Sequence, residues 1–288
     1  MTTPAPRPRK LGIAAGGGVL PLKLAEAARA QGRDVFIVGL KGAAGPSIEV
    51  WPHDWVRLGA MGRFVRLFKQ AGCEDVVFIG PMDRPRLRDI LPDFQGLLLM
   101  PDFIKRLKVG DDALLRGVVE YLERNGLNVV AAETILTSLL AAEGQLSELR
   151  PSTTQEADID IAIRAALDIG SRDIGQGAVV REGKVIALED VKGTDAMLFR
   201  VAAEFPELKG GRSGVLVKLP KPAQDRRVDL PTIGSRTVER AAMAGLAGIA
   251  VEAGGAIIAD TDEIAGVANK LGLFITCFPP SRLDGLKP

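Results

Sequence analysis

Short, uninterrupted apolar runs alternate with segments of helical periodicity through the first half of this chain. The apolar runs cover residues 11–15, 35–40, 76–80 and 127–131, and the helical segments cover residues 21–31, 61–71 and 114–125. Strands that are apolar at every position are covered on both faces, which is typical of parallel sheets between helices. We therefore predict an α/β fold, with a Rossmann-like parallel-sheet domain over residues 11–142.

The second half of the chain has a less regular pattern. Residues 143–152 are rich in Gly, Gln, Ser, Glu and Pro, which is typical of a linker. After them we predict a smaller mixed α/β domain over residues 153–288. Its predicted elements are a helix over 155–169, a hairpin over 178–189 that turns at Glu182-Gly183, a helix over 194–204, a strand over 214–219, a helix over 236–244 capped by Ser235, a short element over 256–259, a helix over 261–271 and a strand over 274–278. Residues 1–10 are predicted to be a disordered tail.

Composition excludes several classes of function. The formal net charge is +1, so no global field attracts nucleic acid and any anion site must be local. His53 is the only histidine, which excludes a multi-histidine zinc site and argues against a Ser-His-Asp triad. Cys73 and Cys277 are the only cysteines, too few for a disulfide framework, which is typical of a protein from a reducing compartment. Both are predicted to be core residues. A metal ion would therefore be a hard one held by oxygen, Mg²⁺ or Mn²⁺.

A stiff basic loop in the second half has the composition of a phosphate site. Between residues 218 and 227 four cations surround a single acid, Asp225, and prolines exclude a helix. The cations are Lys218, Lys221, Arg226 and Arg227. Lysine and arginine bind phosphate oxygens, and a carboxylate among them could hold a metal ion or a water. The alternative is a charged surface turn.

Gly16-Gly17-Gly18 lies between a predicted strand and a predicted helix, where backbone N–H groups can approach a phosphate. The segment matches neither common template. Pro21 occupies the third glycine position of the dinucleotide motif, and Val19 occupies the Ser/Thr position of a P-loop. NAD and ATP chemistry are therefore not supported. A nucleotide site of another design and a purely structural turn both remain open.

A second loop joins a strand to a helix and gathers several polar groups. Glu189 ends the strand, Thr194 begins the helix, and Lys192 lies between them. A capped helix would account for Thr194 but for neither of the other two. If this loop lies near the basic loop, Glu189 and Asp225 would supply two carboxylates for one metal ion.

Six segments in order resemble one family. They are 12–21 (GIAAGGGVLP), 110–116 (GDDALLR), 175–180 (GQGAVV), 188–195 (LEDVKGTD), 217–225 (VKLPKPAQD) and 229–234 (DLPTIG). Through them the chain resembles the UDP-2,3-diacylglucosamine pyrophosphatase family of lipid A biosynthesis, the LpxI type. The resemblance implies hydrolysis of UDP-2,3-diacylglucosamine to UMP and 2,3-diacylglucosamine 1-phosphate (lipid X), by attack at the α-phosphorus with a divalent metal ion.

The basic loop and the resemblance together specify a candidate site. Asp225 and Lys218 are the predicted catalytic residues, and Asp225 and Glu189 the predicted metal ligands. The predicted substrate-binding residues are Gly16, Gly17, Gly18, Gln176, Lys192, Thr194, Lys221, Gln224, Thr232 and Gly234. Two alternatives stay open: a module that binds sugar nucleotides or phospholipids without turnover, and a glycosyltransferase that releases UDP.

A diacylated substrate has further implications. Two acyl chains bury much apolar surface, so we expect an apolar tunnel, with Phe199, Met243, Leu246 and Ile249 as candidate linings, although core packing explains each equally well. We also expect a cytoplasmic protein in peripheral contact with the inner membrane, a homodimer as one possible assembly, and no nucleic-acid partner. No run of 18 apolar residues is present to span a bilayer.

Overall fold

The structure is a computed structural model that describes residues 8–82, 90–206, 211–222 and 224–286. It divides into two compact units. Unit 1 comprises Met1–Thr137 and Asp225–Asp229, and unit 2 comprises Ser138–Gln224 and Leu230–Pro288. The chain therefore contributes to unit 1 twice. Five residues of the predicted second domain belong to unit 1, among them Asp225.

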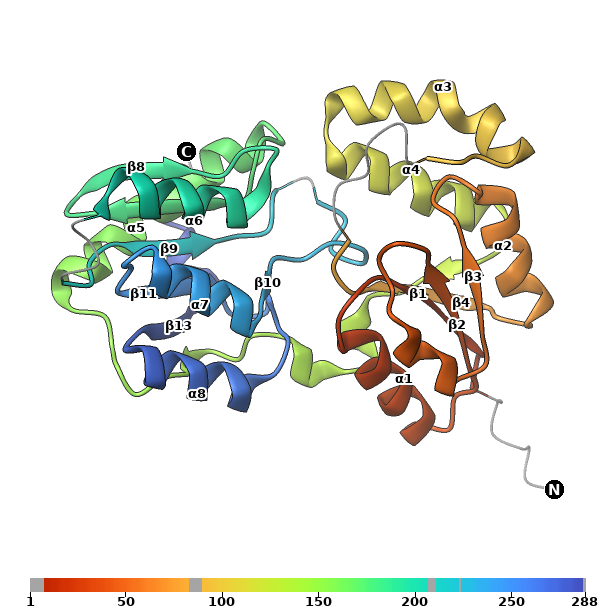
Figure 1. Cartoon of the computed structure of the whole chain (residues 1–288), viewed down its shortest axis with the longest axis horizontal. Helices are drawn as coiled ribbons and strands as arrows, with labels where there is room; N and C mark the ends of the chain where they lie inside the picture. Colours follow the sequence, from red (N-terminus) through yellow and green to blue (C-terminus); the bar gives the residue numbers. More distant parts are fainter. Residues whose placement is uncertain (1–7, 83–89, 207–210, 223, 287–288) are drawn as a thin grey trace. The chain divides into compact units, whose positions relative to one another are not determined.

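Unit 1 is built on a five-stranded sheet whose strands are all parallel (Figure 1). The spatial order is β3 (His53–Val56), β2 (Val35–Leu40), β1 (Leu11–Ala15), β4 (Asp75–Ile79) and β5 (Asn128–Val129). This 3-2-1-4-5 order reverses between β1 and β4, as in Rossmann-like sheets. The predicted fold class is confirmed. Strand β3 was not predicted, because its four residues carry no apolar run and follow Pro52.

The helices of unit 1 follow the pattern of apolar side chains. α1 (Leu20–Ala30) packs on β1 and β2, while α2 (Met61–Gln70) and α4 (Asp111–Arg124) share one core cluster with strand residues such as Val38 and Val76. α3 (Phe94–Val109) does not reach the sheet in this way and packs against α2 and α4 (Figure 1). α3 is therefore an outer layer of unit 1.

Residues 225–229 are fastened to unit 1 by two side chains. Arg227 donates from Nη1 to Glu123 Oε1 of α4 at 2.6 Å and to the Val129 carbonyl at the end of β5 at 3.3 Å. Val228 packs against the same core cluster as α2 and α4. An ion pair and an apolar contact thus anchor a segment that comes from the distant second half of the sequence.

Unit 2 contains a mixed six-stranded sheet. Its order is β6 (Gly144–Gln145), β13 (Phe274–Phe278), β11 (Gly248–Glu252), β9 (Val215–Lys218), β7 (Gly177–Arg181) and β8 (Lys184–Leu188). β9, β11 and β13 are parallel, and β6, β7 and β8 pair in antiparallel fashion. The predicted linker therefore includes strand β6. A separate pair joins β10 (Thr232–Ile233) to β12 (Ile257–Ile258).

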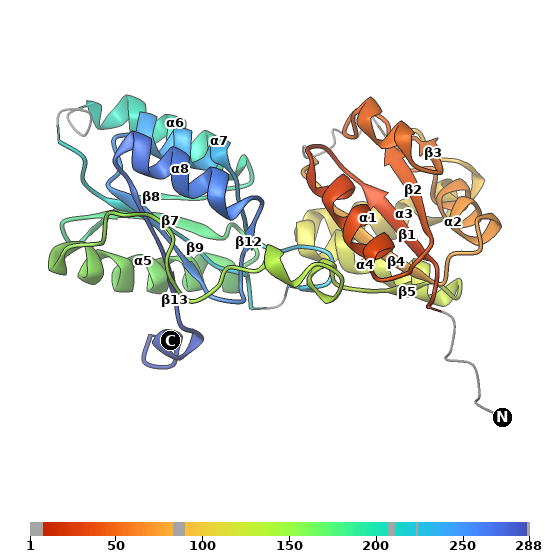
Figure 2. The ribbon, with the colours of Figure 1, turned by 90° about the horizontal axis from the view of Figure 1, so that it is seen from below.

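Helices cover both faces of the unit 2 sheet (Figure 2). α5 (Thr153–Ser171) packs on the face of Val215 and Val217, while α6 (Gly193–Glu204), α7 (Ser235–Met243) and α8 (Thr261–Leu271) pack on the face of Leu216. Because successive side chains of a strand point to opposite faces, β9 is buried on both. Strand β11 was not predicted, since a short apolar run alone does not distinguish a buried strand from a buried helix.

Local details confirm some predictions and correct one. The hairpin turns at Glu182-Gly183, where both residues have positive φ, and the Asp158 carboxylate accepts both of their N–H groups at 2.9 and 2.7 Å. The predicted Ser235 cap is wrong. α7 begins at Ser235 without a side-chain cap, and the Ser235 hydroxyl donates to Glu263 at 2.5 Å. Cys73 and Cys277 are buried as predicted, and burial raises the pKa of both thiols to about 11.

Candidate functional site

Several predicted site residues come together in unit 2, where β9 ends and α6 begins. Lys218 is the last residue of β9 and lies directly opposite Gly177 of β7. On the other side of Gly177, the Glu189 N–H donates to the Gly177 carbonyl at 2.8 Å. Because directly opposite residues point to the same face of a sheet, Lys218 and Glu189 flank Gly177 on the face that α6 covers.

The Glu189 carboxylate is buried and only partly bound. Glu189 is only 6% exposed. Oε1 accepts a hydrogen bond from the Thr194 hydroxyl at 3.1 Å, and Oε2 has no partner among the described residues. A Cβ atom at Gly177 would lie 2.7 Å from Oε2, so a glycine is needed there to make room for the carboxylate. Thr194 therefore positions Glu189, and the interpretation of Thr194 as a helix cap is wrong.

Lys218 and Gln176 are two further residues with unpaired polar groups. Lys218 is 6% exposed, and its ammonium makes no hydrogen bond or ion pair with any residue that the structure describes. The Gln176 Oε1 atom is also buried without a described partner. Burial of unpaired polar and charged groups is costly, and such groups in a native protein call for an explanation. A polar ligand that binds the ammonium and the free oxygens would supply one.

The first turn of α6 lies next to these groups. Lys192 occupies its N-cap position without a side-chain cap, its backbone N–H donates to Asp190 at 2.8 Å, and its side chain is exposed. The N-terminus of a helix favours anions, because its first N–H groups are free and the helix dipole is positive there. The cluster of Glu189, Thr194 and Lys218 thus combines a buried cation, a buried carboxylate and a helix N-terminus.

Two residues of the basic loop have partners within the protein. The Lys221 ammonium lies 2.6 Å from Asp173 Oδ1 in a largely buried ion pair. The Gln224 side chain accepts the Lys221 backbone N–H at 2.9 Å, and Gln224 is buried. Both residues therefore brace the loop after β9, a role that the sequence does not reveal, because Asp173 lies 48 positions away.

Thr232 and Gly234 lie between β10 and α7. The Thr232 hydroxyl donates to the Leu230 carbonyl at 3.2 Å. Gly234 is the N-cap residue of α7 with an extended backbone (φ −128°, ψ 171°), and a Cβ atom there would meet no protein atom within 4 Å. The fold itself therefore does not require a glycine at position 234.

Asp225, in unit 1, is held by Arg227. Its Oδ1 accepts from Arg227 Nε at 3.0 Å and from the Arg227 backbone N–H at 3.1 Å, and its Oδ2 accepts from Nη2 at 2.7 Å. These hydrogen bonds, together with the charges of Arg227 and Arg116, lower the pKa of Asp225 although burial opposes the shift. The prediction that cations keep Asp225 ionised is confirmed.

The glycine loop of unit 1 has clear structural reasons for its composition. The N–H groups of Gly16 and Gly17 donate to the carbonyls of Ile79 and Pro81 at 2.9 and 2.8 Å. A Cβ atom at Gly16 would collide with the Gly80 backbone, and Gly18 has φ +76°. Two of the three N–H groups expected to face a phosphate are therefore already bonded within the protein.

The described residues can be tested against the predicted metal ion. No three His, Cys, Asp or Glu residues are gathered around a common point in the described part of the chain. Mg²⁺, however, keeps several waters and needs only one or two protein carboxylates when it also binds substrate phosphates. The unpaired, buried Oε2 of Glu189 suits such an ion, whereas both oxygens of Asp225 already accept from Arg227. The donor set at Glu189 therefore fits a hard cation.

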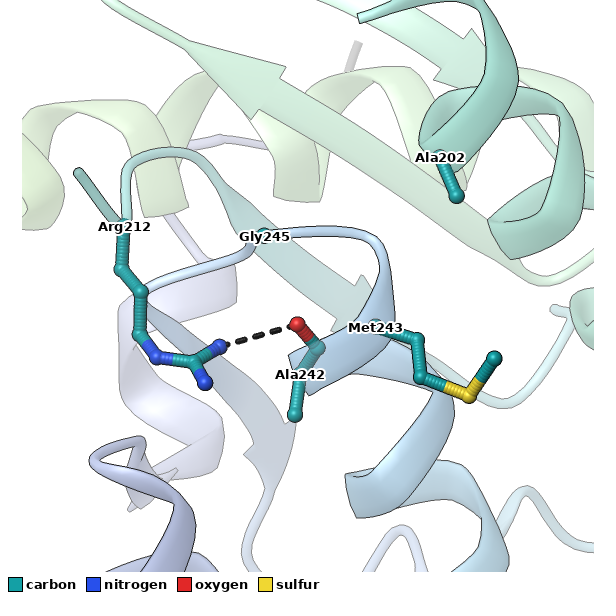
Figure 3. Close-up of a pocket in the computed structure, with 5 residues that line it drawn as sticks. All are labelled: Ala202, Arg212, Ala242, Met243 and Gly245. Atoms are coloured by element: carbon teal, nitrogen blue, oxygen red, sulfur yellow. Dashed lines mark hydrogen bonds between the residues drawn. The ribbon is translucent and has the colours of Figure 1, made fainter. Parts of the chain in front are cut away.

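A separate hollow of about 380 Å³ lies on unit 2 and is lined by Ala202, Arg212, Ala242, Met243 and Gly245 (Figure 3). Arg212 donates to the Ala242 carbonyl at 3.0 Å across it. Met243 is the one candidate acyl contact among these lining residues. Leu246 and Ile249 lie fully buried in the core cluster, and the exposed ring of Phe199 packs against the Arg240 guanidinium. Core packing therefore accounts for Leu246 and Ile249.

The fold and the buried cluster define a class of protein: an α/β protein with a Rossmann-like unit and a second α/β unit that carries a site suited to an anionic ligand. The LpxI N-terminal domain matches residues 10–139, and the LpxI C-terminal domain matches residues 142–276. A protein from Caulobacter vibrioides named UDP-2,3-diacylglucosamine pyrophosphatase LpxI is 44% identical over 278 residues, 95% of this chain and 99% of that protein. The chain belongs to the LpxI family.

Two solved structures show distant similarity to this chain. One is described as an NAD-dependent epimerase/dehydratase from Methylobacillus flagellatus, with 18% identity, a TM-score of 0.25, and coverage of 50% of this chain and 43% of that one. Another is the glycinamide-RNase-transformylase T from Mycobacterium tuberculosis, with 13% identity, a TM-score of 0.24, and coverage of 62% and 44%. At such scores neither structure informs the function of this chain.

Proposed function

We propose that this chain hydrolyses the pyrophosphate bond of UDP-2,3-diacylglucosamine, giving UMP and 2,3-diacylglucosamine 1-phosphate, a step of lipid A biosynthesis. The observation that carries the proposal is the 44% identity, over almost the full length of both chains, to a protein with that named activity. The buried Lys218 of unit 2 supports it independently, because a pyrophosphate ester needs positive charge at its oxygens, and the unpaired Glu189 carboxylate oxygen could reach those oxygens through a metal ion.

The reaction adds water across one phosphoric anhydride bond. Water attacks the α-phosphorus, the bond from that phosphorus to the bridging oxygen breaks, and the bridging oxygen leaves with the sugar phosphate. The negative charge of the pyrophosphate repels the nucleophile, so the protein must neutralise it. The Lys218 ammonium and the first turn of α6 can bind phosphate oxygens in this way.

The remaining predicted residues have supporting roles in the proposal. Lys192 adds positive charge, Lys221 holds the loop after β9 against the substrate through its ion pair with Asp173, and Gln176, Thr194, Gln224, Thr232 and Gly234 contact the substrate. Gly16, Gly17 and Gly18 contact the uridine nucleotide by shape and through the Gly18 N–H, since the other two N–H groups are bonded elsewhere. Asp225, ionised beside Arg227, binds the metal ion or orients the attacking water.

Glu189 would hold a hard divalent cation through its free oxygen. Such a cation supplies charge neutralisation at the phosphate oxygens and lowers the pKa of a bound water. Thr194 keeps the carboxylate in place through its hydrogen bond to Oε1. We also propose peripheral contact with the membrane, because the substrate carries two acyl chains.

Product analysis tests the proposal directly. Purified protein is incubated with detergent-dispersed UDP-2,3-diacylglucosamine and Mg²⁺, with and without excess EDTA, in ¹⁸O-labelled water. We expect Mg²⁺-dependent release of UMP with the label in the UMP phosphate. UDP as the product would instead identify a glycosyltransferase, binding without any product would identify a carrier, and label in the sugar phosphate would place the attack at the β-phosphorus.

Gly234→Ala tests whether substrate approaches this backbone. The extended φ suits alanine and no protein atom lies within 4 Å of the new Cβ, so we expect a melting temperature within about 2 °C of the wild type. If substrate lies against Gly234, KM rises by about tenfold, because displacement of a bound group by a methyl costs roughly 1–3 kcal/mol. Gly16→Ala is the contrasting variant, since its methyl collides with the Gly80 backbone and must lower stability. An unchanged KM for Gly234→Ala would remove Gly234 from the binding site.

A further inference from the structure

Helix α3 exposes an apolar face. Phe94, Leu97 and Leu98 are 72%, 60% and 61% exposed and lie three to four residues apart, and Ile104, which is also exposed, lies two helical turns after Leu97 on the same stripe. Leu91, just before the helix, is exposed as well. Large apolar side chains gathered in this way on the surface of a protein mark an interaction site.

The opposite face of α3 is also apolar. Leu99, Met100, Phe103 and Leu107 are half-buried, and α3 packs against α4 and α2 (Figure 1). Apolar side chains on two opposite faces of a helix favour an apolar environment on each of these faces. Packing within unit 1 provides that environment for one face only, so the outer face of Phe94, Leu97, Leu98 and Ile104 needs another partner.

The charges on α3 favour one kind of partner. The Asp93 carboxylate accepts three backbone N–H groups, from Gly62, Arg63 and Gly96, at 3.2, 2.7 and 2.8 Å. Asp102 is paired with Arg106 at 2.7 Å. Lys105 is exposed next to Ile104 and has no partner among the described residues. The two acids at this end of unit 1 are thus compensated, while a cation on the apolar face is not.

We propose that the outer face of α3 docks on an anionic lipid surface, with Phe94, Leu97, Leu98 and Ile104 in the acyl boundary and Lys105 at the headgroups. Interfacial helices combine these features, apolar side chains flanked by lysine. None of the described helices is long and apolar enough to cross a bilayer, so docking on the surface is the mode that α3 allows. The inference rests on the proposed function in one respect, because a diacylated substrate requires the enzyme to meet a membrane.

Co-sedimentation of the full-length protein with vesicles tests the proposal without substrate. The probes are vesicles of phosphatidylcholine alone and of phosphatidylcholine with 30% phosphatidylglycerol. We expect the wild type to bind the anionic vesicles, Leu97→Ser/Leu98→Ser to bind them at least about tenfold more weakly, and Lys105→Gln to bind them about fivefold more weakly with little change on neutral vesicles. The matched control is Val50→Ser/Leu149→Ser, which removes two exposed apolar side chains elsewhere and should bind as the wild type does.

The outcomes separate docking from catalysis. Hydrolysis of detergent-dispersed substrate should be unchanged in Leu97→Ser/Leu98→Ser, while hydrolysis of substrate in vesicles should fall together with vesicle binding. Equal vesicle binding by this variant and the wild type would overturn the proposal. So would a change from dimer to monomer in light scattering, which would assign the face to a second copy of the chain. Absence of hydrolysis of detergent-dispersed substrate by the wild type would overturn the proposed function. Vesicle binding would still decide whether α3 docks on a lipid surface.

Discussion

Replacement of Asp225 by alanine is expected to lower kcat for UDP-2,3-diacylglucosamine hydrolysis by about 10³-fold, the scale on which electrostatic stabilisation of a transition state is lost. KM should change little, because lysines hold the phosphates. The loss of stability should be small, about 1 kcal/mol, since the Asp225–Arg227 ion pair is partly exposed. The measurements are kcat and KM with Mg²⁺, beside a thermal melt.

Arg227→Gln is the matched control, because it removes the other half of the same ion pair. Arg227 also anchors residues 225–229 to Glu123 and Val129, so its loss should cost at least as much stability as the loss of Asp225. If Asp225 acts in the reaction, Arg227→Gln should lower kcat by no more than about tenfold. Equal losses of kcat in the two variants would mean that Asp225 only holds the loop, and a near-normal kcat for Asp225→Ala would remove it from the active site.

The lowered pKa of Asp225 predicts how this difference depends on pH. A carboxyl group with a lowered pKa in the folded state stabilises the protein above its unfolded pKa of about 3.9, and the contribution is lost as pH falls through the folded value. The stability of wild type and Asp225→Ala should therefore differ at neutral pH and converge in acid. The carboxylate also stays ionised throughout the neutral range, as a metal ligand or a water-orienting group must.

The sequence predicts the elements that have a strong period or a continuous apolar run. β1, β2 and β4 lie within a residue of their predicted positions, because burial on both faces makes them nearly continuous apolar runs. α2 does so because its buried residues have a helical period. α3 was not predicted. It contains Gly96 and Pro101, which disfavour a helix, and its apolar residues lie on two faces and so give no single amphipathic period. Its neighbours in space, α2 and α4, stabilise it instead.

The sequence identified candidate site residues where the residue type itself is informative. It did not identify the residues that these candidates contact in the folded protein. A lone acid among cations singled out Asp225, yet nothing in the sequence indicates that residues 225–229 fold onto unit 1. Glu189 and Lys218 were proposed from separate loops, and only the pairing of β7 with β9 brings them to either side of Gly177. Lys221 resembles a phosphate ligand in sequence, while its ion pair with Asp173 depends on tertiary structure.

Removal of the charge at Glu189 or Lys218 is expected to have the second large effect on activity. Lys218→Met and Glu189→Gln are each expected to lower kcat/KM by about 10²–10³-fold, because each removes one charge from the pyrophosphate site. Each should also leave the melting temperature unchanged or raise it, since each removes a buried charge that has no charged partner among the described residues. Lys192→Met is the control, because Lys192 is exposed and its loss should leave the melting temperature unchanged.

The double variant Lys218→Met/Glu189→Gln distinguishes a functional pair from a structural one. Replacement of two buried charges by neutral groups of similar size is often neutral or stabilising, so its melting temperature should equal or exceed that of the wild type. Activity should be lost, because the phosphate and metal partners are both gone. A double variant less stable than the wild type would show that the two groups hold the fold. Undiminished stability with lost activity would show that the protein keeps two costly buried charges for its substrate.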